Sequence, residues 1–133
     1  MPRLVIIFLF LFGTPAWAGE VDGNSFFCES ISFKGRFMSI EFSNGSVTTD
    51  NSLDDAKWWQ YSATAKFVSW WERFDDLRLL YKLNRKTLIL SLDLNAFGEK
   101  YYRCQFMEIN AARKKVVEEE NYYDKKAREG NKF

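Results

Sequence analysis

The stretch RFMSIEFSNGSVTT, residues 36–49, indicates the fold of this chain of 133 residues. Its apolar residues at positions 38, 40 and 42 alternate with polar ones, which is typical of a strand with one buried face. Asn44-Gly45 follows at once, and this dipeptide favours a type I′ turn because both central residues take positive φ. Val47 to Thr49 then returns as a second strand. We therefore predict a β-hairpin here.

Outward from this hairpin, short segments rich in aromatic and branched aliphatic residues alternate with turn-forming clusters. They predict an all-β fold, a small antiparallel barrel or sandwich of about seven to eight strands. In the first expected strand Phe26 and Cys28 share one face, whereas Ile31 and Phe33 fall on the opposite face. This change predicts a β-bulge near Glu29 or Ser30. Glu72 to Asp76 is expected to form a turn. The expected strands are Ser25 to Phe33, Arg36 to Ser43, Val47 to Thr49, Trp58 to Ala65, Lys66 to Trp71, Leu77 to Leu83, Thr87 to Asp93 and Lys100 to Phe106.

The N-terminal residues predict export. Arg3 precedes the apolar run Leu4 to Phe12, and Ala16-Trp17-Ala18 supplies an A-x-A cleavage site. This pattern is typical of a secretory signal peptide over residues 1–18, and its apolar run is too short for a membrane-spanning helix. We expect a secreted or periplasmic product that begins at Gly19, with no stable membrane insertion after the signal is removed.

Cys28 and Cys104 are the two cysteines of the chain. In an oxidising compartment a single intramolecular disulfide is the default, and two buried free thiols are the alternative. Such a bond would bring the first and last strands together and so would favour a closed barrel or a tight sandwich. We predict that one disulfide closes the sheet.

Composition changes after Ile109 to a charged, helix-favouring segment. Its apolar residues follow three-four spacing and predict one narrow stripe of a helix that ends near Gly130. We therefore divide the chain into a signal peptide at 1–18, a β domain at 19–108 and a charged C-terminal helix or tail at 109–133. The stripe consists of Ile109, Ala112, Val116, Tyr123 and Ala127.

Charge and composition favour a binding protein over an enzyme. The 19 Lys and Arg residues nearly balance 18 Asp and Glu residues, so the chain lacks the positive field that nucleic acid requires. The absence of histidine excludes His-based triads and the commonest neutral metal ligand. Asp54-Asp55 and Asp75-Asp76 are expected to be solvated turn residues, since adjacent acids point apart. We identify no catalytic residue, metal site or cofactor.

Two features mark a binding surface. The doublets Trp58-Trp59 and Trp70-Trp71 should each send one ring inward and one outward, because neighbouring residues of a strand face opposite sides. We expect loops or the C-terminal helix to cover both outward rings, with availability to a partner as the alternative. Leu80, Ile89 and Tyr101 form an apolar stripe on the outer face of three strands. We expect the C-terminal helix to cover this stripe, with a partner surface as the alternative.

Phe26-Phe27-Cys28, Cys104, Tyr61-Ser62 and Trp70-Trp71 carry a resemblance to a known family. The chain resembles the bacterial periplasmic and membrane-bound inhibitors of c-type lysozyme. These are small exported β-barrels with an aromatic-x-Cys signature near the mature start and a second Cys near the end. Ser62 is followed by Ala63 where that family has the Gly of its inhibitory Ser-Gly loop. The resemblance implies a lysozyme-inhibiting barrel.

The sequence as a whole therefore favours an exported, non-catalytic β domain that binds another protein or a cell-envelope glycan. A lysozyme-inhibitor-like protein is the first alternative. A carboxylate-dependent hydrolase is the second.

Overall fold

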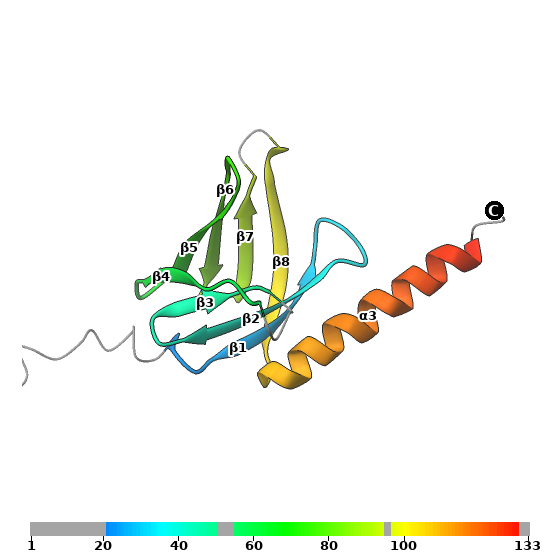
Figure 1. Ribbon diagram of the computed structural model, residues 1–133, viewed down its shortest axis with the longest axis horizontal. Coiled ribbons are helices and arrows are strands. Elements are labelled where there is room, and N and C mark those ends of the chain that lie inside the picture. The colour runs from blue at the N-terminus through cyan, green and yellow to red at the C-terminus, as the bar shows by residue number, and fades with distance from the viewer. Residues whose placement is uncertain (1–20, 51–54, 95–96, 131–133) are drawn as a thin grey trace, which may run out of the picture.

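Eight antiparallel strands form a closed barrel in which each strand pairs with its neighbours in the sequence (Figure 1). The computed structural model describes residues 21–50, 55–94 and 97–130, so the predicted signal peptide and Asp54 lie outside the described residues. The strands and the C-terminal helix are β1 (Ser25–Ser30), β2 (Phe37–Ser43), β3 (Ser46–Thr48), β4 (Trp59–Ala63), β5 (Phe67–Phe74), β6 (Leu77–Asn84), β7 (Ile89–Asp93), β8 (Glu99–Phe106) and α3 (Ile109–Gly130).

Antiparallel pairing between β1 and β8 closes the barrel. Cys28 lies directly opposite Cys104 in this pairing, and the two form a disulfide. The described residues include no free cysteine. The predicted disulfide is therefore confirmed, and of the two predicted architectures, barrel or sandwich, the chain forms the barrel.

The hairpin expected within residues 36–49 forms as predicted. Asn44 and Gly45 take φ values of 52° and 77°, which are the positive values that a type I′ turn requires. The predicted bulge is absent: β1 pairs without interruption and ends at Ser30. Ile31 and Phe33 lie beyond the end of β1 and are half exposed. Their change of face relative to Cys28 therefore reflects the end of the strand and not a bulge within it.

Inward-facing side chains from every strand fill the barrel. The core includes fully buried Phe42, Ile40 and Leu90, and Trp70 lies among them with 2% of its surface exposed. Trp70 stacks on Tyr81 at 5.1 Å between ring centroids and meets Phe42 edge-on at 5.6 Å. This aromatic packing gives a short chain a large apolar core.

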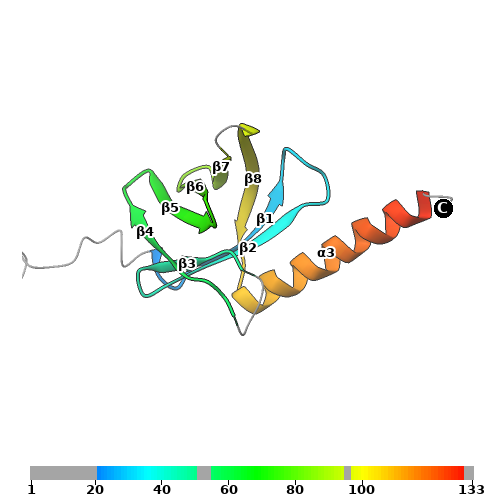
Figure 2. The ribbon, with the colours of Figure 1, turned by 45° about the horizontal axis from the view of Figure 1, so that its top comes forward.

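The C-terminal helix packs on the outside of β1 and β2, and its far end extends away from the barrel (Figures 1 and 2). Ala112 and Val116 are buried against Phe27, and Tyr123 packs against Phe37 at 5.7 Å. A salt bridge of 2.7 Å from Arg113 to Glu41 of β2 adds to this contact. In the described part of the chain, no helix has the length and hydrophobicity that a membrane span requires.

This position corrects the expectation that the helix covers Leu80, Ile89 and Tyr101. Phe27 has outward parity on β1 and still is only 4% exposed, because the helix covers it. Phe27 and Phe37 stack at 5.6 Å and form one aromatic surface on the outer wall of β1 and β2. The helix therefore packs on this aromatic pair and not on Leu80, Ile89 and Tyr101. Ala127, the last residue of the predicted stripe, is exposed and lies past Tyr123, where the helix contacts Phe37.

Candidate functional site

The second tryptophan doublet divides between the two faces of the barrel wall, as predicted. Trp70 is 2% exposed and points into the core, whereas Trp71 is 48% exposed on the outside. Neither a described loop nor the C-terminal helix covers Trp71, so the expectation that both rings are covered is wrong for this residue. Arg78 lies over the Trp71 ring, with its guanidinium 4.9 Å from the ring centroid.

The first doublet lies at the start of β4. Trp58 precedes the strand, is 43% exposed and borders a shallow pocket beside Asn44. Trp59 is half-buried and packs against the core. Its ring lies 6.2 Å from the ring of Phe74. The inward rings of both doublets, Trp59 and Trp70, therefore pack in one core, and Trp58 and Trp71 are the exposed members.

Trp71 belongs to a cationic and aromatic surface on the outer faces of β5 and β6. Cross-strand pairing sets Trp71 opposite Leu80 and Arg73 opposite Arg78. Lys82 holds its ammonium 4.1 Å from the Phe67 ring centroid. We call this surface the Trp71 face; it consists of Phe67, Trp71, Arg73, Arg78, Leu80 and Lys82.

The register separates the three residues of the predicted stripe. Leu80 lies opposite Trp71 on one side and Asp93 on the other. Ile89 lies opposite Arg103, and Tyr101 lies opposite Ser91. Only Leu80 therefore contributes to the Trp71 face, and the other two are bordered by polar neighbours.

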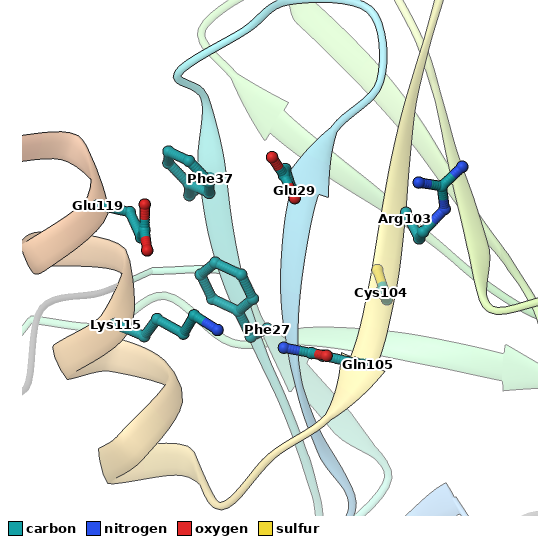
Figure 3. A pocket seen from close by; sticks show the side chains of 8 residues that line it. All are labelled: Phe27, Glu29, Phe37, Arg103, Cys104, Gln105, Lys115 and Glu119. Atoms are coloured by element: carbon teal, nitrogen blue, oxygen red, sulfur yellow. The ribbon is translucent and has the colours of Figure 1, made fainter. Parts of the chain in front are cut away.

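A groove of about 370 Å³ lies between the C-terminal helix and the β1–β8 wall (Figure 3). Lys115 and Glu119 reach into it from the helix, while Glu29 and Arg103 line it from the barrel. The Lys115 ammonium lies 4.8 Å from the centroid of the Phe27 ring. Since two acids balance two cations and the Phe27 ring is already covered, the groove offers no dominant charge and no open apolar floor. We assign it to helix docking.

Glu72 is a buried carboxylate that the sequence pattern placed in a turn. The structure extends β5 to Phe74, so Glu72 faces inward two residues after Trp70 and is 2% exposed. Its Oε2 accepts hydrogen bonds from Trp70 Nε1 at 3.0 Å and from Thr49 Oγ1 at 2.8 Å. Burial, opposed by these hydrogen bonds, raises the pKa of Glu72 above its ordinary value. Its spacing from Trp70 is the sequence signal that could have found it.

Glu72 lines a pocket of about 300 Å³ at the end of the barrel where β5 turns into β6. We call it the mouth pocket. Three aromatic side chains, two carboxylates, one hydroxyl and one ammonium line it. They are Trp59, Phe74, Tyr81, Asp50, Glu72, Thr49 and Lys57.

The predicted turn acids form no second site. Asp75 and Asp76 form the tight β5–β6 turn, where Asp75 takes a positive φ of 53°. Residues 21–50, 55–94 and 97–130 contain no cluster of three or more potential metal ligands. The Trp71 face and the mouth pocket are therefore the two surfaces with distinctive chemistry among the described residues.

Comparison of the chain with protein-family models, with curated proteins and with solved structures found no match. We therefore infer function from the geometry of these two surfaces.

Proposed function

We propose that this domain is an exported, non-catalytic binding module that recognises an acidic protein partner through the Trp71 face. The observation that carries the proposal is Trp71, which stands 48% exposed in the middle of a strand with Arg78 over its ring. Trp and Arg are the residue types most enriched at the energetic centres of protein interfaces. The position of the helix on β1 and β2 leaves this face open.

Charge on the Trp71 face favours an acidic partner. Arg73 and Arg78 lie directly opposite each other, an arrangement that destabilises an isolated sheet. Within the described residues, neither arginine takes part in a salt bridge. A carboxylate from a partner would relieve this repulsion, and Trp71 and Leu80 would supply apolar contact beside it. A protein with acidic side chains around an apolar anchor matches these features better than a neutral glycan does.

The acids of the described chain support a non-catalytic role. A glycosidase-type reaction needs two accessible carboxylates about 5 to 9.5 Å apart across a cleft. Asp50 and Glu72 line the same pocket, but Glu72 is 2% exposed and its carboxylate already accepts hydrogen bonds from core side chains. These hydrogen bonds hold the Glu72 carboxylate in place, so it is not an accessible general acid or nucleophile for a glycosidic bond. The predicted signal peptide and the confirmed disulfide support a secreted or periplasmic location.

The test is a pull-down from a cell-envelope extract with the mature domain and matched variants. We expect Trp71→Ala and Arg78→Ala to abolish capture of an acidic protein. Trp58→Ala should retain it, because Trp58 is similarly exposed but borders the pocket beside Asn44 and is not one of the residues of the Trp71 face. Raised salt should weaken capture, since charge contributes to it. Capture that survives Trp71→Ala, or recovery of glycan alone, would contradict the proposal.

A lysozyme inhibitor is the second candidate function. The closed barrel and the Cys28–Cys104 bond agree with what the family resemblance implies. Ser62, however, lies within β4 opposite Ser69 and not in a protruding loop. A lysis assay with c-type lysozyme separates the candidates: inhibition that survives Trp71→Ala and is lost with Ser62→Tyr would favour the inhibitor.

A further inference from the structure

We propose that the mouth pocket binds a small primary alkylammonium ion, of the kind presented by an aliphatic amine or a lysine side chain. The pocket combines aromatic walls with two carboxylates in about 300 Å³. This site is distinct from the Trp71 face, because Glu72 and Phe74 point inward from β5 whereas Trp71 and Arg73 point outward.

The walls of the pocket suit a cation next to an alkyl chain. Trp59 and Phe74 lie 6.2 Å apart at 59° between ring planes, and Tyr81 forms a further wall. Aromatic faces attract an ammonium group through the negative potential of the ring. The same surfaces make apolar contact with methylene groups. A neutral polar ligand would gain only the second of these contributions.

The carboxylate of Glu72 retains acceptor capacity toward the pocket. Thr49, Trp70 and Tyr81 donate hydrogen bonds to it. An ionised carboxylate offers about four acceptor positions, so three donors leave about one. An ammonium N–H can fill this position, and Asp50 adds a second negative charge on the pocket wall. A quaternary ammonium has no N–H, so the geometry favours a primary amine.

Lys57 already places an ammonium group at this pocket. Its Nζ lies 5.8 Å from the Phe74 ring centroid, and its side chain is exposed. The chain therefore holds at the rim the same chemical group that we propose as the ligand. A free alkylammonium ion would compete with Lys57 for Phe74 and then reach further in, toward Glu72.

The experiment uses n-butylammonium as the probe and n-butanol as its neutral counterpart. Binding to the full mature chain is followed by NMR through the indole N–H signals of Trp59 and Trp70. We expect saturable shifts with n-butylammonium in the millimolar range and at least tenfold weaker binding of n-butanol. Equal binding of the two probes would overturn the proposal, because the pocket would then be only an apolar cavity.

Substitutions at the rim keep the test independent of core damage. Lys57→Met should strengthen n-butylammonium binding several-fold by removing the competing ammonium, a gain that misfolding cannot produce. Lys86→Met is the matched control, since Lys86 is an exposed lysine in the turn at the opposite end of β6. Asp50→Asn should weaken binding. Unchanged affinity in both Lys57→Met and Asp50→Asn would refute the site, whatever the outcome for the Trp71 face.

Discussion

Cys28 and Cys104 lie directly opposite each other in the one strand pair that joins the beginning of the barrel to its end. Every other described strand pair connects neighbours in the sequence, so only β1 and β8 must find each other across the whole domain. The disulfide therefore acts on the contact with the largest loop-closure cost.

We expect removal of this bond to lower the free energy of unfolding substantially. A double Cys28→Ala, Cys104→Ala variant frees a loop with a sequence separation of 76 residues. The chain-entropy relation gives a loss of about 4 kcal/mol. Urea unfolding of the oxidised protein and of the variant measures the difference. A loss below about 1 kcal/mol would mean that pairing between β1 and β8 maintains closure without the bond.

Docking of the helix depends on one of two adjacent valines. Val116 is 4% exposed and packs against Phe27, whereas Val117 is 48% exposed. Val116→Asp would bury a charge against an aromatic pair, so we expect destabilisation by about 1 to 3 kcal/mol and exposure of Phe27. Val117→Asp should stay within about 0.5 kcal/mol of wild type. Thermal melts and binding of a hydrophobic dye check both, and equal effects would contradict the observed helix face.

Replacement of the two adjacent tryptophans of β5 should have very different effects on stability. Trp70→Ala removes a core ring stacked on Tyr81 and deprives Glu72 of a hydrogen-bond donor, so we expect a loss of about 3 to 5 kcal/mol. Trp71→Ala removes an exposed ring and should cost about 0.5 kcal/mol. Chemical denaturation of each variant measures these losses. A large loss for Trp71→Ala would indicate a structural role and weaken its assignment to partner binding.

Glu72 should make stability depend on pH. Burial raises its pKa in the folded protein above the value in the unfolded chain, so the folded state holds this proton more tightly. Its stabilising contribution is therefore complete below the ordinary glutamate pKa and is lost as pH rises through the raised pKa. Glu72→Gln removes this dependence. The melting temperature of the variant, relative to wild type, should increase between about pH 4 and about pH 8; a difference that stays level or decreases would contradict the prediction.

Local patterns of the sequence determined the strands, their inward faces and the first hairpin. Asn44-Gly45 specified its turn because few other residue pairs accept positive φ at both positions. Alternation placed Trp70 inside and Trp71 outside because neighbouring side chains of a strand face opposite sides. Likewise, the stripe predicted from three-four spacing includes Ala112 and Val116, the two buried positions of the helix. Each of these features depends on residues that are close in the sequence.

Tertiary structure alone decided where the helix packs and what surrounds Glu72. Spacing within the helix defines its apolar side but not its partner, and the barrel offered both Leu80 and Phe27 on its outer wall. Phe27 and Phe37 lie side by side only because β1 pairs with β2, and the helix covers the aromatic surface that results. The local sequence around Glu72 predicts a turn. In the structure, Thr49, 23 positions earlier, and Tyr81 donate hydrogen bonds to its buried carboxylate. A buried carboxylate requires such partners from distant strands, and no local pattern records them.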